Sequence, residues 1–104
     1  CSGVALIFVH LPSAVRPGIH RRLARALAPG GWLILECFHP RQLDYPSGGP
    51  REVDMLSDLA AIRSDFSPLL EEVVAWEGEV VLNEGEGHKG PAFVTRYVGR
   101  MPAP

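Results

Sequence analysis

Two segments of the chain are apolar at almost every position, and this lack of alternation constrains the fold more than any other feature. Val4–Val9 contains no polar residue, and Trp32–Phe38 contains a single charge, Glu36. A strand without polar–apolar alternation is typical of the interior of a parallel sheet, where both faces are covered. The sequence therefore predicts two parallel strands inside a layered α/β fold.

An amphipathic helix is predicted between these two strands. Pro17 suits its first turn, and Pro29-Gly30-Gly31 suits the sharp turn that ends it. The apolar residues at helical spacing are Ile19, Leu23, Ala26 and Leu27. The polar residues expected to form the solvated face are Arg16, His20, Arg21, Arg22 and Arg25. Such a strand–helix–strand unit has a right-handed crossover.

The second half of the chain predicts a long loop, a helix and a hairpin. The loop covers residues 39–53 and is rich in proline and glycine, and loops of this length are more often functional than not. Asp54 is expected to cap the helix that follows. Strands are expected at 70–83 and 92–101, with a glycine-rich turn between them and Gly78 marking a bulge. The element order is then β-α-β-α-β-β, with the last two strands antiparallel.

Composition narrows the class of protein. The chain has 104 residues, of which 46% are hydrophobic, and a formal net charge of −2. It is one small domain or a piece of one, and this charge argues against a nucleic-acid partner. The longest apolar run, Val4–Val9, is too short to cross a membrane. Because Cys1 and Cys37 do not suggest a disulfide, a cytoplasmic location is expected.

Several short motifs occur in an order that resembles the second half of class I S-adenosylmethionine-dependent methyltransferases. Leu27–Gly31 (Leu-Ala-Pro-Gly-Gly) precedes a buried strand, and a hairpin closes the chain. Phe8–Pro12, Gly48–Pro50 and Gly87–Gly90 resemble the tellurite-resistance type branch of that family. The resemblance covers nearly the whole chain. It implies a three-layer, Rossmann-like half-sheet of two or three parallel strands, ordered 1-2-4-3, with an antiparallel last strand.

The chain also departs from this family. The family binds its cofactor through a glycine-rich loop after the first strand and an acidic residue after the second, and no Gly-x-Gly-x-Gly follows a strand here. Residues 1–104 are therefore expected to be a partial domain, the C-terminal half of the fold, which lacks the N-terminal cofactor-binding half. S-adenosylmethionine is the implied cofactor, with weak or no binding by this chain alone.

Three histidines are expected at the carboxyl ends of the strands, where ligands bind in open α/β sheets. His10 and His88 are the candidate catalytic bases, although methyl transfer needs little beyond positioning of the acceptor. By resemblance, Val9, His10 and Leu11 lie beside the methionine end of the cofactor. Each histidine also has a structural alternative as a turn or loop residue. No close pair of ligands supports a metal site.

The candidate substrate-binding residues are Glu36, His39, Tyr45 and Arg51. Glu36 either contacts the substrate or pairs with an arginine, because a carboxylate in a buried strand needs a partner. Tyr45 and Arg51 could line a lid formed by the long loop. The substrate is expected to be a small-molecule methyl acceptor. The alternative function is a non-catalytic binding or oligomerisation module that kept the fold without the chemistry.

The strand Val4–Val9 is expected to have an exposed edge if the first half of the fold is absent. No charge or proline protects this edge, so another chain must cover it. The simplest solution is a twofold homodimer in which Val4–Val9 pairs with its own copy, with Leu6, Phe8, Leu11 and Ile19 near the interface. The other solution is a complementing N-terminal half.

Overall fold

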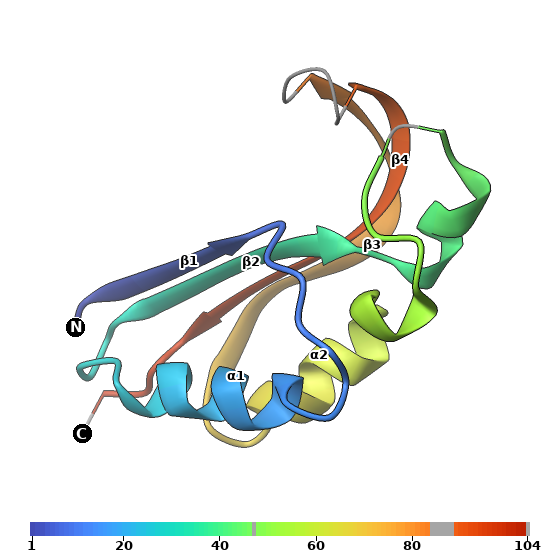
Figure 1. The fold of residues 1–104 in the computed structure, drawn as a ribbon. Coiled ribbons are helices and arrows are strands. Elements are labelled where there is room, and N and C mark those ends of the chain that lie inside the picture. Colours follow the sequence, from blue (N-terminus) through green and yellow to red (C-terminus); the bar gives the residue numbers. More distant parts are fainter. Residues whose placement is uncertain (47, 84–88, 104) are drawn as a thin grey trace.

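The computed structural model describes residues 1–46, 48–83 and 89–103, and its elements follow the predicted order (Figure 1). The strands are β1 (Gly3–Ile7), β2 (Trp32–Phe38), β3 (Glu71–Asn83) and β4 (Lys89–Arg100). The α-helices are α1 (Arg16–Arg25) and α2 (Leu59–Phe66), and the 3-10 helices are η1 (Pro40–Asp44) and η2 (Val53–Met55). Neither α-helix of this described part has the length and apolar character needed to span a membrane.

The four strands form one mixed sheet in the order β1-β2-β4-β3. β1 pairs with β2 in parallel, whereas β4 is antiparallel to both β2 and β3. The last strand is therefore inserted between its neighbours, which confirms the predicted strand order. Trp32 pairs with Arg100 and Phe38 with Val94, so β4 follows the whole length of β2.

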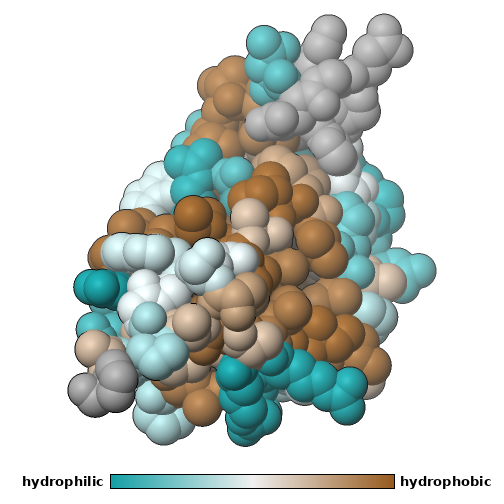
Figure 2. Space-filling model, turned by 90° about the vertical axis from the view of Figure 1, so that its left-hand side faces the viewer, coloured by the Kyte–Doolittle hydropathy of each residue, from teal (hydrophilic) through white to brown (hydrophobic). Residues whose placement is uncertain are grey.

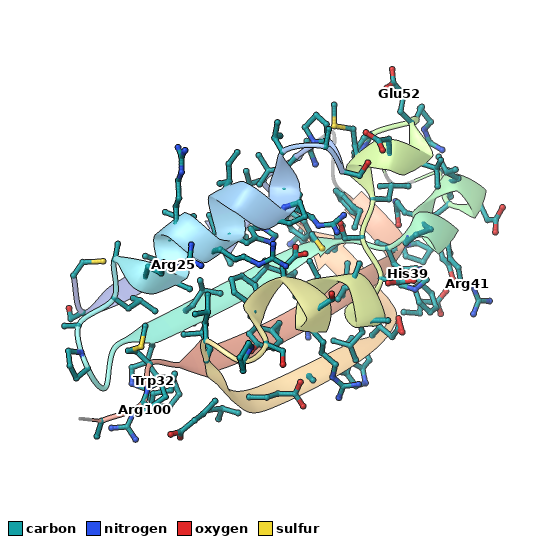
Figure 3. The ribbon with its side chains drawn as sticks, turned by 90° about the horizontal axis from the view of Figure 1, so that it is seen from below. Arg25, Trp32, His39, Arg41, Glu52 and Arg100 are labelled. Carbon is teal, nitrogen blue, oxygen red and sulfur yellow. The ribbon has the colours of Figure 1, made fainter. Side chains whose placement is uncertain are left out.

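Both α-helices lie on the same face of the sheet (Figures 1 and 3). Between them and the strands is the main core: Ala24, Leu27, Leu33, Leu35, Cys37, Ile62, Phe66, Leu70 and Tyr97. A second, smaller core lies where β3 ends and β4 begins. It consists of Phe38, Leu56, Leu82, Ala92 and Val94. The described chain thus supplies the sheet and one helical layer, two of the three layers expected.

Within the described chain, the two apolar strands β1 and β2 are covered on one face only. Along β2, Leu33 and Leu35 are 0% and 3% exposed, while the alternate residues Trp32 and Ile34 are 41% and 47% exposed. β1 shows the same alternation. Apolar side chains also reach the surface on the side of the molecule where β1 and β2 begin (Figure 2, brown). A sequence pattern typical of two-sided burial therefore coexists with one-sided burial within this chain.

A buried ionic cluster joins the two helices. His20 Nδ1 donates to Asp65 Oδ2 at 2.8 Å, and Arg16 Nε donates to the same oxygen at 2.8 Å. His20 is 4% exposed and Asp65 is 2% exposed. The expectation that His20 and Arg16 belong to the solvated face was therefore wrong: these residues, four positions apart, face inward because α2 presents a carboxylate to them.

Helix α2 begins later than the sequence predicted. Its N-cap is Asp58, whose side chain accepts a hydrogen bond from the Ala61 backbone N–H at 2.8 Å. Asp54, the predicted cap, lies instead in η2, where its carboxylate accepts hydrogen bonds from both the backbone and the hydroxyl of Ser13. These bonds from Ser13 lower the pKa of Asp54. Asp54 therefore fastens η2 to the start of the α1 segment.

Gly78 has a different role from the predicted bulge. The irregularity of β3 falls between Glu72 and Val74, and Gly78 pairs regularly with Val94. A Cβ atom at position 78 would lie 2.5 Å from the Trp76 ring. The missing side chain thus lets the indole ring lie along the strand.

Candidate cofactor and substrate site at the strand ends

The end of β1 makes a sharp turn at Phe8. Phe8 has a φ of 53°, a left-handed conformation that costs a non-glycine residue roughly 1–3 kcal/mol. Its N–H donates to the Glu36 carbonyl at 2.7 Å, and its ring stacks on Phe38 at 4.7 Å. These two contacts hold the strained turn, which directs Val9 out of the sheet at the carboxyl end of the parallel strands.

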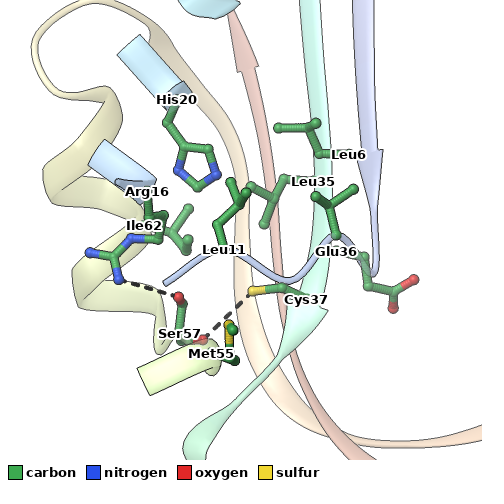
Figure 4. Close-up of a pocket in the computed structure, with 11 residues that line it drawn as sticks. Leu6, Leu11, Arg16, His20, Leu35, Glu36, Cys37, Met55, Ser57 and Ile62 are labelled. Carbon is green, nitrogen blue, oxygen red and sulfur yellow. Dashed lines mark hydrogen bonds between the residues drawn. The ribbon is translucent and has the colours of Figure 1, made fainter. Parts of the chain in front are cut away.

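The three residues predicted beside the cofactor follow this turn. Val9 is 45% exposed, His10 is exposed and Leu11 is half-buried. The His10 ring stacks on Phe38 with a centroid distance of 6.1 Å. Val9 and Leu11 line a small pocket under the ends of β1 and β2 (Figure 4). This segment therefore offers an aromatic and aliphatic surface at the strand ends.

The pocket is mainly apolar. Leu6, Leu35, Met55 and Ile62 line it together with Val9 and Leu11. Cys37 also faces it, with its thiol donating to the Ser57 carbonyl at 3.7 Å. Burial raises the pKa of the Cys37 thiol to about 12, so the group is protonated at neutral pH and is a poor nucleophile. At about 10 Å³ the pocket is near the minimum size for a single water molecule, and its thiol is not an activated nucleophile.

His39 is held by both of its ring nitrogens. Nδ1 accepts a hydrogen bond from the Arg41 backbone N–H at 3.0 Å, and Nε2 donates to Glu77 Oε2 at 2.9 Å. Its ring also meets the Phe93 ring edge to face at 4.7 Å. His39 thus caps η1 and ties it to β3 and β4, so any contact with a substrate would come from a fixed imidazole.

Tyr45 and Arg51 shape the loop after η1. The Arg51 guanidinium donates to the carbonyls of Leu43 and Tyr45 at 3.2 and 2.9 Å. A hydrogen bond to Glu79 raises the pKa of Tyr45, so its hydroxyl is the donor. Arg51 therefore stabilises the loop from within, while Tyr45 attaches it to β3.

Glu36 also lines the pocket, but its side chain points away from Leu35 and Cys37, toward the opposite face of the sheet (Figure 4). Its Oε2 accepts a hydrogen bond from Arg96 Nε at 2.6 Å, and the Arg96 guanidinium lies 5.5 Å from the Trp76 ring. Of the two roles that the sequence left open for Glu36, the structure contains the pairing with an arginine. A substrate reaching Glu36 would have to come from the face of the sheet that carries Trp32, Ile34 and Trp76 and that no described helix covers, here called the uncovered face.

The structure groups the candidate residues into separate sites. Val9 and Leu11 share the pocket, His39 and Tyr45 gather around Phe93, and Glu36 lies on the other face. His88 lies outside the described residues. Sequence reasoning missed the importance of Gln42, which is 0% exposed and bonds the Phe93 N–H and the Gly48 carbonyl. Its burial depends on loop packing, which no local pattern indicates.

The crevice that would hold a nucleotide cofactor is incomplete within the described part of the chain. In open α/β sheets, ligands bind where the strand order reverses direction. Here β1, β2 and β3 advance across the sheet in one direction, with both α-helices on one face, so the described sheet contains no reversal. No Gly-x-Gly-x-Gly motif follows a strand in the sequence, and the glycine-rich segment between β3 and β4 is not followed by a helix.

No family model and no curated protein matches this chain. Several solved structures, however, have a similar fold. One comes from work on the conversion of a disulfide bond into a thioacetal group during echinomycin biosynthesis, with a TM-score of 0.69, 11% identity, and coverage of 98% of this chain and 49% of the other. N-methyltransferase NodS from Bradyrhizobium japonicum WM9 gives a TM-score of 0.65, 13% identity, and coverage of 97% and 51%.

A third similar structure is a SAM-dependent methyltransferase from Methanosarcina mazei, with a TM-score of 0.64, 12% identity, and coverage of 99% of this chain and 60% of the other. The chain thus has a mixed α/β fold with an inserted antiparallel strand. This fold is that of class I S-adenosylmethionine-dependent methyltransferases. The chain spans about half to three-fifths of the length of these structures.

Proposed function

We propose that this chain is the C-terminal, substrate-side half of an S-adenosylmethionine-dependent methyltransferase, and that it acts only when a complementing half completes the cofactor site. The observation that carries the proposal is the match of nearly the whole chain to 51% and 60% of two methyltransferase structures. The tellurite-resistance type branch is part of this proposal, on the motifs around Phe8–Pro12 and Gly48–Pro50.

The residues of this chain would have limited tasks in such an enzyme. S-adenosylmethionine supplies the activated methyl group when it is bound. Val9, His10 and Leu11 would contact its methionine end, and the imidazole of His10 would accept a proton from the acceptor if one must leave. His88 is the second candidate base. Glu36, His39, Tyr45 and Arg51 would contribute to the walls of the site for a small-molecule acceptor.

The second candidate function is a non-catalytic binding module derived from this fold. It is favoured by the exposed apolar face of the sheet, where Trp32, Ile34 and Trp76 are 41%, 47% and 41% exposed. Large exposed apolar patches mark interaction surfaces. For either function, the partners that the sequence predicts are a second copy pairing through Val4–Val9 or a complementing half.

Titration of the isolated chain with S-adenosylmethionine, followed by amide NMR, separates these functions. We expect a dissociation constant above about 10 μM, weaker than about −7 kcal/mol, with shifts confined to Phe8–Leu11. L-methionine should shift the same amides and adenosine should not. The absence of any shift at about 5 mM would favour the binding module, and binding tighter than about 10 μM would contradict the incompleteness of the site.

A further inference from the structure

The small pocket at the ends of β1 and β2 has two kinds of wall. Most of its lining is apolar, and the partly exposed residues Val9, Leu11 and Met55 form its outer side. Its inner side carries two buried polar side chains, His20 from α1 and Ser57 from the segment between η2 and α2. In Figure 4 the ring of His20 points from α1 into the group of side chains that line the pocket. These polar groups distinguish the pocket from purely apolar cavities, which stay empty.

The imidazole of His20 has a partner for one of its two nitrogens. Burial opposes ionisation of Asp65, but hydrogen bonds from His20 and Arg16 lower its pKa, so its carboxylate can only accept. His20 Nδ1, 2.8 Å from Asp65 Oδ2, therefore carries the proton, and in the neutral ring Nε2 has a lone pair. No donor to Nε2 is found within residues 1–46, 48–83 and 89–103. Because His20 is 4% exposed, this acceptor requires a partner inside the molecule.

Ser57 presents the complementary group. Its backbone N–H donates to the Phe38 carbonyl at 3.0 Å, and its own carbonyl accepts from Thr95 Oγ1 at 2.7 Å. Its hydroxyl oxygen accepts from Arg16 Nη1 at 3.5 Å, which leaves the hydroxyl proton without an acceptor in the described chain. Ser57 is 6% exposed. The wall of the pocket thus holds one buried acceptor, on His20, and one buried donor, on Ser57.

The size of the pocket determines what can join these two groups. At about 10 Å³ the pocket is near the smallest volume that holds one water molecule. A water between the two groups would donate to His20 Nε2 and accept from the Ser57 hydroxyl, and two such partners are enough to hold a buried water. Arg16 bonds both Asp65 and Ser57, so the two sides of the pocket are held together by one guanidinium.

We propose that this pocket binds one water molecule between His20 Nε2 and Ser57 Oγ, and that the Asp65–His20 pair accepts protons from the strand ends through that water. The pair has the arrangement of a general base, in which a carboxylate fixes the tautomer of an imidazole and stabilises its protonated form. The imidazole itself is buried, and the water connects it to the outer side of the pocket.

The ionisable groups around His20 come from the elements packed against it. Arg16 on α1 and Asp65 on α2 share a hydrogen bond and together carry no net charge. On β2, the Cys37 thiol lines the pocket, and burial raises its pKa to about 12, so it stays neutral. Glu36 also lines the pocket, but its side chain points toward the other face of the sheet. Among the described residues of the lining, His20 is therefore the base that can take up a proton.

In the proposed enzyme, the water gives the proton of the methyl acceptor a route to His20, and this step rests on the proposed function. The outer side of the pocket includes Val9 and Leu11, which are proposed to contact the methionine end of the cofactor. The X–H bond of the acceptor breaks and its proton bonds to the water oxygen, while one O–H bond of the water breaks and that proton bonds to Nε2. The water is regenerated, and the imidazolium remains beside the Asp65 carboxylate. His20 is then a second proton acceptor for the reaction, besides the candidate His10.

NMR spectroscopy of the chain tests the water and the base together. Long-range 1H–15N spectra of the histidine side chains should show His20 with a protonated Nδ1 and an unprotonated Nε2. Water–protein NOE and ROE spectra should show a long-lived water beside the methyl groups of Leu35 and Ile62, which line the pocket. As the pH is lowered, the His20 signals should shift reversibly while the chain stays folded, because the water connects Nε2 to the solvent.

A matched pair of variants locates the water. Ser57→Ala removes the hydroxyl and leaves the backbone bonds of this residue intact, so the water cross-peaks should be lost. Ser64→Ala makes the same change at an exposed position on α2 and should leave the cross-peaks unchanged. Circular dichroism checks that both variants fold, and the spectra of the natural sequence decide the inference if Ser57→Ala does not.

Each of the opposite results would overturn the inference. They are an absence of water cross-peaks in the natural sequence, a protonated Nε2 in the neutral ring, cross-peaks that persist in Ser57→Ala, and His20 signals that shift only when the chain unfolds. None of these results would remove the proposed function, because methyl transfer needs little beyond positioning of the acceptor. If the completed site binds no S-adenosylmethionine, the proposed function fails while the water and the Asp65–His20 pair remain.

Discussion

On the helical side of the sheet, Leu33 and Tyr97 are 0% and 2% exposed, and the Tyr97 ring stacks on Phe66 at 5.1 Å. On the other side, the Arg100 guanidinium lies 5.4 Å from the Trp32 ring (Figure 3), and 41% of Trp32 is exposed. The two sets of side chains are of similar size and hydrophobicity. They differ because the two α-helices cover the first set and no described helix covers the second.

This difference separates residues that stabilise the isolated chain from residues that are available to a partner. Burying a large apolar side chain contributes roughly 1.5–3 kcal/mol, and only the helical side gains this within the chain. On the uncovered face, residues of the same kind gain only part of this stabilisation, through contacts such as that of Arg96 with Trp76. Substitutions on the two faces should therefore have unequal effects on stability.

The largest effect is expected from Phe66→Ala. Phe66 is 0% exposed and its ring lies between His20 and Tyr97, so its removal leaves a cavity that costs about 3–5 kcal/mol. Ile34→Ala, on the uncovered face, should cost less than about 1 kcal/mol. Urea unfolding measures both. Equal losses would show that the two faces are equally covered and would refute the comparison.

The next effect concerns the ionic cluster on the helical side. Asp65→Asn removes the carboxylate that Arg16 and His20 share, and leaving those two groups without it should cost about 3 kcal/mol. The control is Glu72→Gln, which breaks the exposed bond to Arg63 and should cost less than about 1 kcal/mol. A loss at Asp65 no greater than that at Glu72 would show that the cluster contributes little.

The same cluster predicts a response to acid. Burial opposes ionisation of Asp65, but hydrogen bonds from His20 and Arg16 outweigh it and lower the pKa of Asp65 below its usual value. The unfolded chain therefore takes up the proton first. The stabilisation is complete above about pH 4 and is lost as pH falls through the lower folded pKa. Urea unfolding between pH 6 and pH 2.5 should show a smaller decline for Asp65→Asn than for the natural sequence.

A smaller change in stability is expected on the uncovered face, with a clear change in surface properties. Trp32→Ser combined with Ile34→Thr should lower the fluorescence of the dye ANS bound to the folded chain, because the dye binds exposed apolar surface. Replacing Val81 by Thr, away from this face, is the control. Unchanged dye fluorescence in the double variant would mean that this face is not the main exposed apolar surface.

The smallest expected change involves the two thiols. At pH 8, a pKa of about 12 leaves roughly one Cys37 thiol in ten thousand ionised. Cys1 is exposed. The colorimetric reagent DTNB should therefore react at once with Cys1 and reach Cys37 only when urea unfolds the chain. Two fast-reacting thiols in the folded protein would contradict the burial of Cys37.

The strand order could be predicted because two signals agreed. The apolar runs Val4–Val9 and Trp32–Phe38 required a parallel pair, and the closing hairpin resembled the inserted strand of a known family. The side that each helical residue faces could not be predicted. The helical spacing of Ile19 and Leu23 predicted a buried helix face without His20. His20 faces inward because Asp65 on α2 lies opposite it, which the sequence does not indicate.

The candidate site was less predictable than the fold. Val9 and Leu11 do line one pocket, because a strand end fixes where the next residues lie. His39 and Arg51 are held by bonds to neighbouring loop residues and strands, which depend on how the loop folds back. Asp54 and Asp58 are equally good caps in the sequence, and the choice between them rests on the contact of Asp54 with Ser13.

The central position of β4 affects how the chain can fold as it is made. Synthesis runs from the N-terminus, and β4 is the last of the four strands to be completed, yet both β2 and β3 pair with it. Until β4 is complete, the edges of β2 and β3 that pair with it stay open, although the contact of α1 with α2 already links the two parts of the chain. The sheet must therefore close late and cooperatively, and growing chains need protection from association until then.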